Sequence, residues 1–226
     1  MKAARGTPLK KVHCGDNVVF CLTRTNDRII FLSMTKGEDT KEMILDIGLE
    51  MASRLGLEAV SIGVLAKAAE MSKSGLFAHF QSKENLQIEI LRYAGQLFSE
   101  GVVNPALRIQ AGIPRIRALV DNWINWTARI TGGCIFVQAG NDFKDRAGKV
   151  RDFLMLQQDA WIDSLRRIAQ SAIRVGHFRQ DMDCDQFAFE LYSLLLGFHL
   201  YTKLLQIEDT KARQQTALDS LIKRYQ

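Results

Sequence analysis

The fold of this 226-residue chain is decided by the stretch SIGVLAKAAEMSKSGLFAHFQSKENL, residues 61–86. Ser61 and Ser72 each stand directly before a short run with helical spacing, and serine is a preferred residue at helix N-termini. The first run ends near Ala69 and the second ends at Phe80. Two short helices joined by a turn of three or four residues form a helix-turn-helix. We therefore expect this motif in the first half of the chain.

The second helix of the motif is the one expected to enter the major groove of DNA. That groove is about 12 Å wide and admits a single helix, whose N-terminal residues reach the base edges. Leu76 and Phe80 are spaced to face inward, against the first helix. The predicted DNA contacts in this segment are Ser72, Lys73, Ser74, Gly75, Phe77, Ala78 and His79.

Contacts to the DNA backbone are expected from the flanking helices. Lys83 opens a helix that runs over residues 82–100, where the positive end of the helix dipole and a lysine together suit a phosphate. For a lysine of this kind the alternative is a solvated surface side chain. The predicted set is completed by Lys41, Ser61 and Gly63.

The run of about residues 40–86 resembles the N-terminal domain of the tetracycline-repressor (TetR) family. The residues that match the family pattern are Ala66, Ala69, Ser72, Leu76, His79, Phe80, Ser82, Lys83, Glu84 and Leu86. The resemblance implies an all-helical homodimer with a small DNA-binding domain, a helical domain that holds a small-molecule pocket, and a dimer formed by the last two long helices. It also implies a transcriptional repressor that an effector releases from its operator, although activators occur in the family.

Three positions depart from the family pattern. Glu70 stands where the turn usually has glycine, and a left-handed backbone at a glutamate costs roughly 1 kcal/mol. Gly75 replaces the usual threonine and Phe77 the usual tyrosine, which removes two hydroxyl groups. These departures favour the alternative function, a helical protein-interaction adaptor with a degenerate helix-turn-helix.

The remainder of the sequence favours an all-α fold. Helices are expected over about residues 39–55, 114–130, 135–139, 145–175, 187–205 and 210–225. Between residues 101 and 112 the chain is expected to loosen around Pro105. The predicted domains are an N-terminal extension (1–33), a helix-turn-helix domain (34–86) that leads into the helix at 82–100, and a C-terminal helical ligand-binding and dimerisation domain (101–226).

Aromatic and polar residues in the C-terminal half predict a small-molecule pocket, with ordinary core packing as the alternative. The predicted lining is Trp123, Trp126, Thr127, Phe136, Phe153, Gln157 and Trp161. Cys134 stands beside the double glycine. We expect a buried inert thiol there, because the sequence places few cations near it, and a redox sensor is the alternative.

The segment 187–205 is apolar on nearly every side, so a second subunit is expected to cover one of its faces. A two-fold homodimer would read a pseudo-palindromic double-stranded operator with half-sites about one helical turn apart. The predicted dimer interface is Phe187, Leu191, Leu194, Leu195, Phe198, Leu218, Leu221 and Ile222.

Composition and residue spacing argue against several other classes of protein. Apolar residues make up 47% of the chain and charged residues 24%, which is typical of a globular protein. The four cysteines form no CxxC pair, which argues against a zinc site and fits a reducing cytoplasm. No Glu-x-x-His pair and no glycine-rich phosphate loop occurs, so no enzyme, cofactor or metal is expected. Glu190, His199 and Lys203 interrupt the apolar segment, so no membrane span is expected either.

Residues 1–33 differ from the rest of the chain. Residues 17–22 and 28–33 favour β-structure and make at most an isolated hairpin. We expect an upstream extension of a protein that begins near Met34, with a genuine N-terminal arm as the alternative. This segment has six basic and two acidic residues, a net of +4 out of the chain's +5. The basic balance is therefore poor evidence for DNA binding, which rests on the placement of Lys73 and Lys83.

Overall fold

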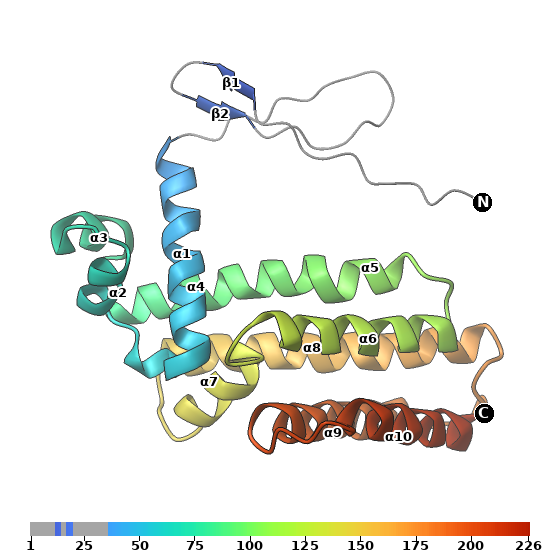
Figure 1. The fold of residues 1–226 in the computed structure, drawn as a ribbon. Coiled ribbons are helices and arrows are strands. Elements are labelled where there is room, and N and C mark those ends of the chain that lie inside the picture. The colour runs from blue at the N-terminus through green and yellow to red at the C-terminus, as the bar shows by residue number, and fades with distance from the viewer. Residues whose placement is uncertain (1–11, 15–16, 20–35) are drawn as a thin grey trace. The chain divides into compact units, whose positions relative to one another are not determined.

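The computed structural model describes residues 12–14, 17–19 and 36–226, and its contacts divide the chain into two units, Met1–Ile44 and Leu45–Gln226 (Figure 1). In the first unit β1 (Val12–Cys14) pairs antiparallel with β2 (Asn17–Val19). The sequence predicted a pairing of 17–22 with 28–33, but residues 17–19 pair with 12–14, which are only two residues away. Residues 28–33, like the rest of the expected extension outside the two strands, lie outside the described residues.

Three serine-capped helices follow α1 (Lys36–Leu55) and the 3-10 turn η1 (Leu57–Ala59). They are α2 (Ile62–Ala68), α3 (Lys73–Phe80) and α4 (Lys83–Phe98). The Oγ atoms of Ser61, Ser72 and Ser82 accept hydrogen bonds from backbone N–H groups three residues later, at 3.3, 3.1 and 3.1 Å. The predicted caps and the predicted helix-turn-helix are confirmed.

The turn between α2 and α3 contains the left-handed residue that the sequence predicted. Glu70 has a φ of 53°, and the Met71 N–H donates to the Ala66 carbonyl at 2.9 Å. The Glu70 N–H donates to the Lys67 carbonyl at 3.4 Å. This pair of bonds is the Schellman arrangement that ends many helices, usually with glycine at the position of Glu70.

The expected loosening from Gly101 is wrong. After α4 the chain continues through a π-helical turn, η2 (Ser99–Val103), directly into α5 (Asn104–Leu107). Pro105 lies in the first turn of α5, where its missing N–H is tolerated, and the wider π turn absorbs the irregularity. The break comes later, before Gly112, whose φ is 98°.

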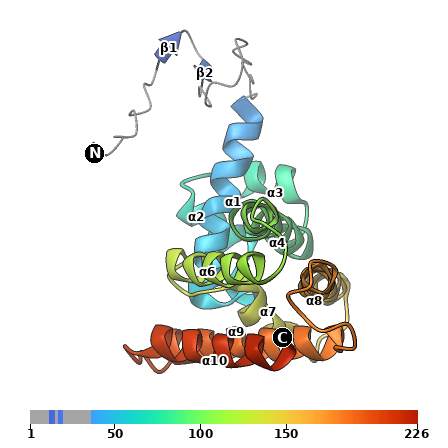
Figure 2. The ribbon, with the colours of Figure 1, turned by 90° about the vertical axis from the view of Figure 1, so that its right-hand side faces the viewer.

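The C-terminal helices are α6 (Ile113–Arg129), α7 (Ile135–Phe143), α8 (Lys149–Arg174), α9 (Cys184–Lys203) and α10 (Thr210–Tyr225). They confirm the predicted helices, with α7 longer than expected. Within this unit α8 packs on α4 and α9, and α9 packs on α10 (Figure 2). The predicted all-α fold is thus confirmed for residues 36–226.

The residues predicted for the dimer interface lie mostly inside the single chain. Seven of them, Phe187, Leu191, Leu195, Phe198, Leu218, Leu221 and Ile222, are buried, and Leu194 is half-buried. Helical spacing reveals that α9 is apolar on two sides, but it does not reveal which side the chain's own helices cover. The prediction therefore selected residues that α9 and α10 bury within the chain.

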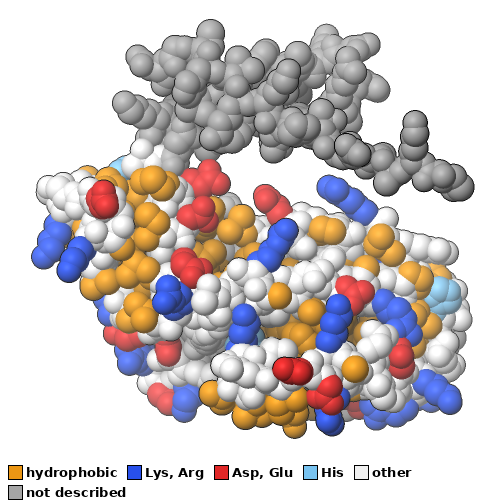
Figure 3. All heavy atoms as spheres, viewed as in Figure 1, with side chains coloured by type: hydrophobic (Ala, Val, Ile, Leu, Met, Phe, Trp, Pro, Cys, Tyr) orange, Lys and Arg blue, Asp and Glu red, His pale blue; other side chains and the backbone are white. Residues whose placement is uncertain are grey.

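The apolar side of α9 that stays exposed comprises Phe189, Leu196, Leu200, Tyr201 and Leu204, with exposed fractions of 37% to 71%. We call it the α9 outer face. Hydrophobic side chains gather at the edge of the second unit formed by α9 and α10 (Figure 3). None of the helices among residues 36–226 is both long and apolar enough to cross a membrane.

Candidate nucleic-acid interface and internal cavity

Helix α3 buries one side and exposes the other, as predicted. Leu76 and Phe80 are buried, while Phe77 is 55% exposed. Of the other predicted DNA contacts on this segment, Ser72, Lys73, Ser74, Ala78 and His79 are exposed, and Gly75 is half-buried. The outer surface of α3 therefore presents one cation, two hydroxyl groups, one imidazole and one phenyl ring.

The start of α3 lies against the start of α2. A Cβ at Gly63 would lie 3.3 Å from Lys73 Cε, so the Lys73 side chain passes over that glycine. Ser72 Oγ and Ser74 Oγ are 3.2 Å apart and share a hydrogen bond. A Cβ at Gly75 would lie 3.1 Å from Ser72 Oγ, so the glycine leaves room for this cap. The structure thus brings Gly63, Ser72, Lys73, Ser74 and Gly75 together, next to the half-buried Ser61 that caps α2.

Lys83 has a protein partner that the sequence did not predict. Its Nζ atom lies 2.9 Å from Glu58 Oε1, and Arg146 Nη1 lies 3.0 Å from the same oxygen. The Lys83 hydrogen bond lowers the pKa of the Glu58 carboxyl, and Arg146 adds to this effect. A phosphate at the start of α4 would have to compete with Glu58 for Lys83. The sequence does not signal either ion pair of Glu58, because Lys83 lies 25 residues away and Arg146 lies 88 residues away.

Lys41, the remaining predicted DNA contact, lies on α1 in the first unit and is half-buried.

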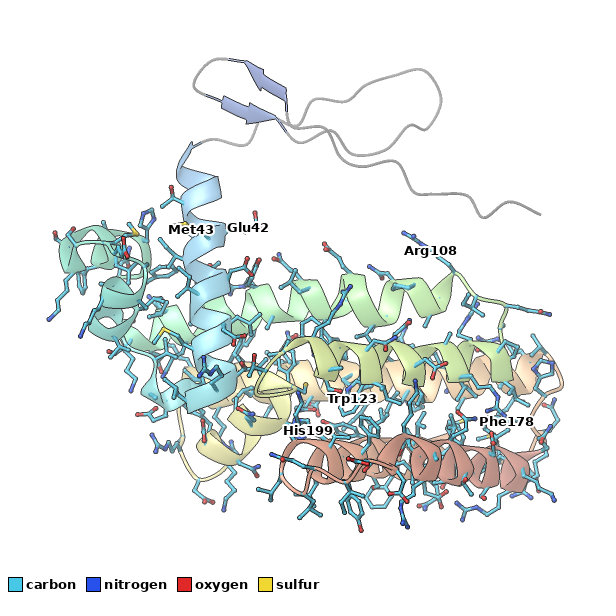
Figure 4. The ribbon with its side chains drawn as sticks, in the orientation of Figure 1. Glu42, Met43, Arg108, Trp123, Phe178 and His199 are labelled. Atoms are coloured by element: carbon cyan, nitrogen blue, oxygen red, sulfur yellow. The ribbon has the colours of Figure 1, made fainter. Side chains whose placement is uncertain are left out.

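A cavity of about 120 Å³ lies between the helices of the C-terminal half. Trp123 and Trp161 are buried in its wall, and Figure 4 shows Trp123 on α6 directed toward α9. The side chains of Phe98 and Trp161 pack edge to face, with ring centroids 5.0 Å apart. The residues that line it are Gly95, Phe98, Ser99, Val103, Trp123, Cys134, Phe136, Gln157, Gln158, Ala160, Trp161, Ser164 and Tyr192.

Four of the seven predicted pocket residues line this cavity, namely Trp123, Phe136, Gln157 and Trp161. The other three do not. Trp126 packs edge to face against Phe98, and Thr127 is buried with its hydroxyl donating to the Ile124 carbonyl. Phe153 is half-buried beneath the Arg92 guanidinium, whose carbon lies 5.6 Å from the ring centroid. Helical spacing placed Phe153 on the correct helix but one turn too far from the cavity.

Sequence reasoning missed the contributions of α4 and α9 to the cavity. Gly95, Phe98 and Ser99 come from α4 and η2, and Tyr192 comes from α9. The inward position of Phe98 within the periodicity of α4 was the available signal. The thiol of Cys134 also lines the cavity, and burial raises its pKa, which supports the inert reading of this residue over the redox one.

The turn between α6 and α7 is held by two side chains from α9. The Cys134 N–H donates to His199 Nε2 at 3.2 Å, and Lys203 Nζ donates to the Ile130 carbonyl at 3.0 Å. His199 must be neutral to accept this bond. Burial, and then the charge of Lys203, lower its pKa.

This contact predicts a pH dependence of stability. Because the folded pKa of His199 is depressed, the unfolded chain binds more protons as pH falls through about 6.5. The free energy of unfolding should therefore keep the whole contribution of neutral His199 above that pH. Below it, the free energy of unfolding should decline by up to about 1.4 kcal/mol per pH unit for one group. Denaturant titrations between pH 7.5 and 5 measure this slope. His199→Gln keeps an acceptor without a titrating proton and should flatten the slope. Equal slopes for this variant and the wild-type chain would contradict this account.

In the described part of the chain, no three His, Cys, Asp or Glu side chains gather in a way that could hold a metal ion. The arrangement offers a helix-turn-helix surface at one place and an aromatic cavity at another, and α4 extends from one to the other. Comparison with known proteins agrees with both parts. Residues 44–90 match the family model "Bacterial regulatory proteins, tetR family", and residues 112–218 match "Tetracyclin repressor-like, C-terminal domain".

The chain belongs to the TetR family. The HTH-type transcriptional regulator AcrR of Shigella flexneri is 34% identical over 55 residues, which are 24% of this chain and 26% of AcrR. The match therefore spans about a quarter of that relative's length.

Two solved structures show that the TetR-family fold extends beyond the helix-turn-helix. A TetR transcriptional regulator from Chloroflexus aurantiacus aligns with a TM-score of 0.74 and 22% identity, over 84% of this chain and 96% of its own. AibR in complex with isovaleryl coenzyme A and operator DNA aligns with a TM-score of 0.62 and 22% identity, over 82% and 97% of the two chains.

Proposed function

We propose that this chain is a ligand-responsive DNA-binding transcriptional regulator, and specifically a repressor that a small-molecule effector releases from its operator. The observation that carries the proposal is the capped helix α3, which buries Leu76 and Phe80 and exposes Lys73, Ser74 and Phe77. A helix with this exposure suits the major groove, and cations at helix N-termini suit the phosphates beside it. Such an action on chromosomal DNA places the protein in the cytoplasm.

The proposed DNA contacts are Lys41, Ser61, Gly63, Ser72, Lys73, Ser74, Gly75, Phe77, Ala78, His79 and Lys83. Of the three lysines in this set, Lys73 has an exposed side chain at the start of α3, and Lys83 contributes only when a phosphate replaces Glu58 as its partner. Phe77 replaces a hydroxyl-bearing residue with an apolar ring, which favours contact with a thymine methyl group.

The regulator acts as a homodimer in this proposal. Two copies related by a two-fold axis would place their α3 helices about 34–36 Å apart, on a pseudo-palindromic operator. The α9 outer face is the surface that a second copy covers, because it is apolar and no other part of the second unit covers it. Neighbouring exposed apolar side chains often mark a subunit interface.

A charge on the α9 outer face should therefore separate the subunits. Leu200→Glu places a carboxylate in the middle of this surface, and an unpaired charge is costly to bury. We expect the dissociation constant of the dimer to rise at least about tenfold. Sedimentation velocity over a concentration series measures the change, with Ile109→Glu as the control, since Ile109 is exposed elsewhere. If Leu200→Glu dimerises as well as Ile109→Glu, the α9 outer face is not the interface.

Two physical connections would carry the effector signal to α3. Helix α4 begins at Lys83 and contributes Gly95 and Phe98 to the cavity wall. A displacement of α4 at the cavity therefore also moves Lys83 at the start of the helix. The second connection joins η1 to α7, where the Leu57 N–H donates to Asp142 Oδ2 at 3.1 Å. Arg146, which follows α7, pairs with Glu58 and so completes the second connection.

An effector must bind the non-DNA-binding state more tightly, and a coupling of about 1 to 3 kcal/mol would suffice. Binding of AibR to operator DNA and to isovaleryl coenzyme A illustrates this pair of activities in a relative of the same fold.

The proposal is tested by measuring the affinity of the purified full chain for DNA fragments that flank its own gene. Fluorescence anisotropy at fixed salt should find one fragment bound at least about 10³-fold more tightly than a shuffled sequence of equal length. Equal affinity for all fragments would favour the protein-interaction adaptor and contradict the regulator.

A further inference from the structure

The cavity in the C-terminal half is small for a ligand site. Its volume is about 120 Å³, whereas pockets for drug-sized molecules measure roughly 300–1,000 Å³. A cavity of roughly 150 Å³ in another protein accommodates benzene. The space therefore suits a molecule with a single ring. Ser99 and Ala160 are both exposed and line the cavity, so they mark a route to solvent.

The wall of the cavity is aromatic and uncharged. Phe98, Trp123, Phe136, Trp161 and Tyr192 contribute rings, and none of the described residues in the lining is acidic, basic or a histidine. Burial raises the pKa of Tyr192 to about 12, so its hydroxyl stays protonated. A charged ligand would lose its hydration here without gaining an ion pair, which disfavours it strongly.

One buried hydrogen-bond donor in the wall lacks a partner. The Trp161 indole N–H is buried and has no hydrogen-bond acceptor among the described residues. Two polar side chains of the wall are already engaged: the Tyr192 hydroxyl donates to Gln158 Oε1 at 2.8 Å, and Gln158 Nε2 donates to the Phe136 carbonyl at 3.2 Å. A buried donor left unpaired costs about 1–3 kcal/mol, so an acceptor supplied by a ligand is favoured at Trp161.

We propose that this cavity binds an uncharged molecule with one aromatic ring and a hydrogen-bond acceptor, such as a carbonyl oxygen, that pairs with the Trp161 indole N–H. The inference rests on the proposed function in taking the cavity as the effector site. It adds the size, the charge and the polar group of the effector.

Two other ligand classes fit the wall less well. Aromatic rings attract quaternary ammonium groups, but no described carboxylate lines this cavity to balance the positive charge. The hydrogen of the unpartnered Trp161 indole N–H is itself partly positive and would repel a cation. Large anionic ligands exceed the volume and meet no cation in the lining. The unpartnered Trp161 indole N–H therefore favours a neutral ligand that carries a hydrogen-bond acceptor.

Four probes of similar size separate these classes. Acetophenone carries the ring and the carbonyl, and ethylbenzene has nearly the same shape without the acceptor. Benzoate supplies the negative charge and phenyltrimethylammonium the positive one. Isothermal titration calorimetry on the full chain without DNA should show acetophenone binding about tenfold more tightly than ethylbenzene, with neither ion bound measurably. Tightest binding by either ion, or equal binding of the two neutral probes, would overturn the proposal.

Two variants tie the result to the cavity. Trp161→Phe keeps a ring but removes the N–H, so it should weaken acetophenone binding about tenfold and leave ethylbenzene unchanged. Val103→Phe fills the space from the α4 side and should abolish binding of both neutral probes; its thermal melt verifies folding. Undiminished acetophenone binding in either folded variant would refute the assignment.

The proposed function fails separately from this inference. Because the titrations contain no DNA, loss of operator binding leaves the cavity result standing, and a chain that binds its operator but none of the probes contradicts only the ligand class.

Discussion

Ser74→Glu is expected to weaken specific DNA binding strongly while leaving the protein folded. Ser74 is exposed in the first turn of α3, where an acidic side chain is favourable to the helix, by about 0.3–1 kcal/mol. The same carboxylate would meet the phosphates of a major groove, and like charges placed together at an interface cost several kcal/mol. Affinity for the operator should fall about a hundredfold, and the melting temperature should stay the same or rise.

The control for this variant is Gln110→Glu, which adds the same charge at an exposed position between α5 and α6. It separates local repulsion from the effect of net charge on DNA binding. Both variants are measured by anisotropy at equal salt on the same fragment. If Ser74→Glu binds as tightly as Gln110→Glu, α3 does not face the DNA.

Gly132→Ala is expected to destabilise the fold by about 3 kcal/mol, at the upper end of the usual range for overpacking. A Cβ at Gly132 would lie 1.5 Å from the Ser53 carbonyl oxygen and 3.0 Å from the Arg54 nitrogen. Both atoms are backbone at the end of α1, so no side chain can move aside. The turn between α6 and α7 would have to separate from α1. Chemical denaturation measures the change.

Gly140→Ala is the matched control, because the unfolded chain loses one glycine in each variant. A Cβ at Gly140 would meet nothing within 4 Å, and the residue lies inside α7, so alanine should stabilise the helix by about 0.5–1 kcal/mol. The two variants should therefore differ in sign. Equal stabilities would mean that the turn does not contact α1 in solution.

Local features of this fold were predictable from the sequence. Ser61, Ser72 and Ser82 act within three residues of their partners, so the caps and the helix-turn-helix followed from spacing alone. The left-handed backbone at Glu70 followed from the family pattern at the turn. The predicted end of the helix at 145–175 also held, since α8 ends at Arg174 and Gly176 follows with a φ of 74°.

Features that depend on distant contacts were not predictable. Phe187 and Leu191 are apolar and periodic, but whether their partner is α10 or a second subunit is decided by packing. Phe153 has the spacing of an inward residue but lies half-buried beneath Arg92, away from the cavity. The pairing of Lys83 with Glu58 joins residues 25 positions apart, and no helical period links them. The same limit applied to Trp161, whose missing partner is visible only in three dimensions.

The most direct test of the account is the salt dependence of operator binding by the wild-type chain and by the Lys73→Ala, Lys83→Ala double variant. Each phosphate contact contributes about 0.9 to the slope of log affinity against log salt, so a dimer that loses four lysines should lose about 3 to 4 in slope. The account predicts this decrease together with weaker binding at low salt. An unchanged slope and affinity would contradict the claim that the starts of α3 and α4 face the DNA.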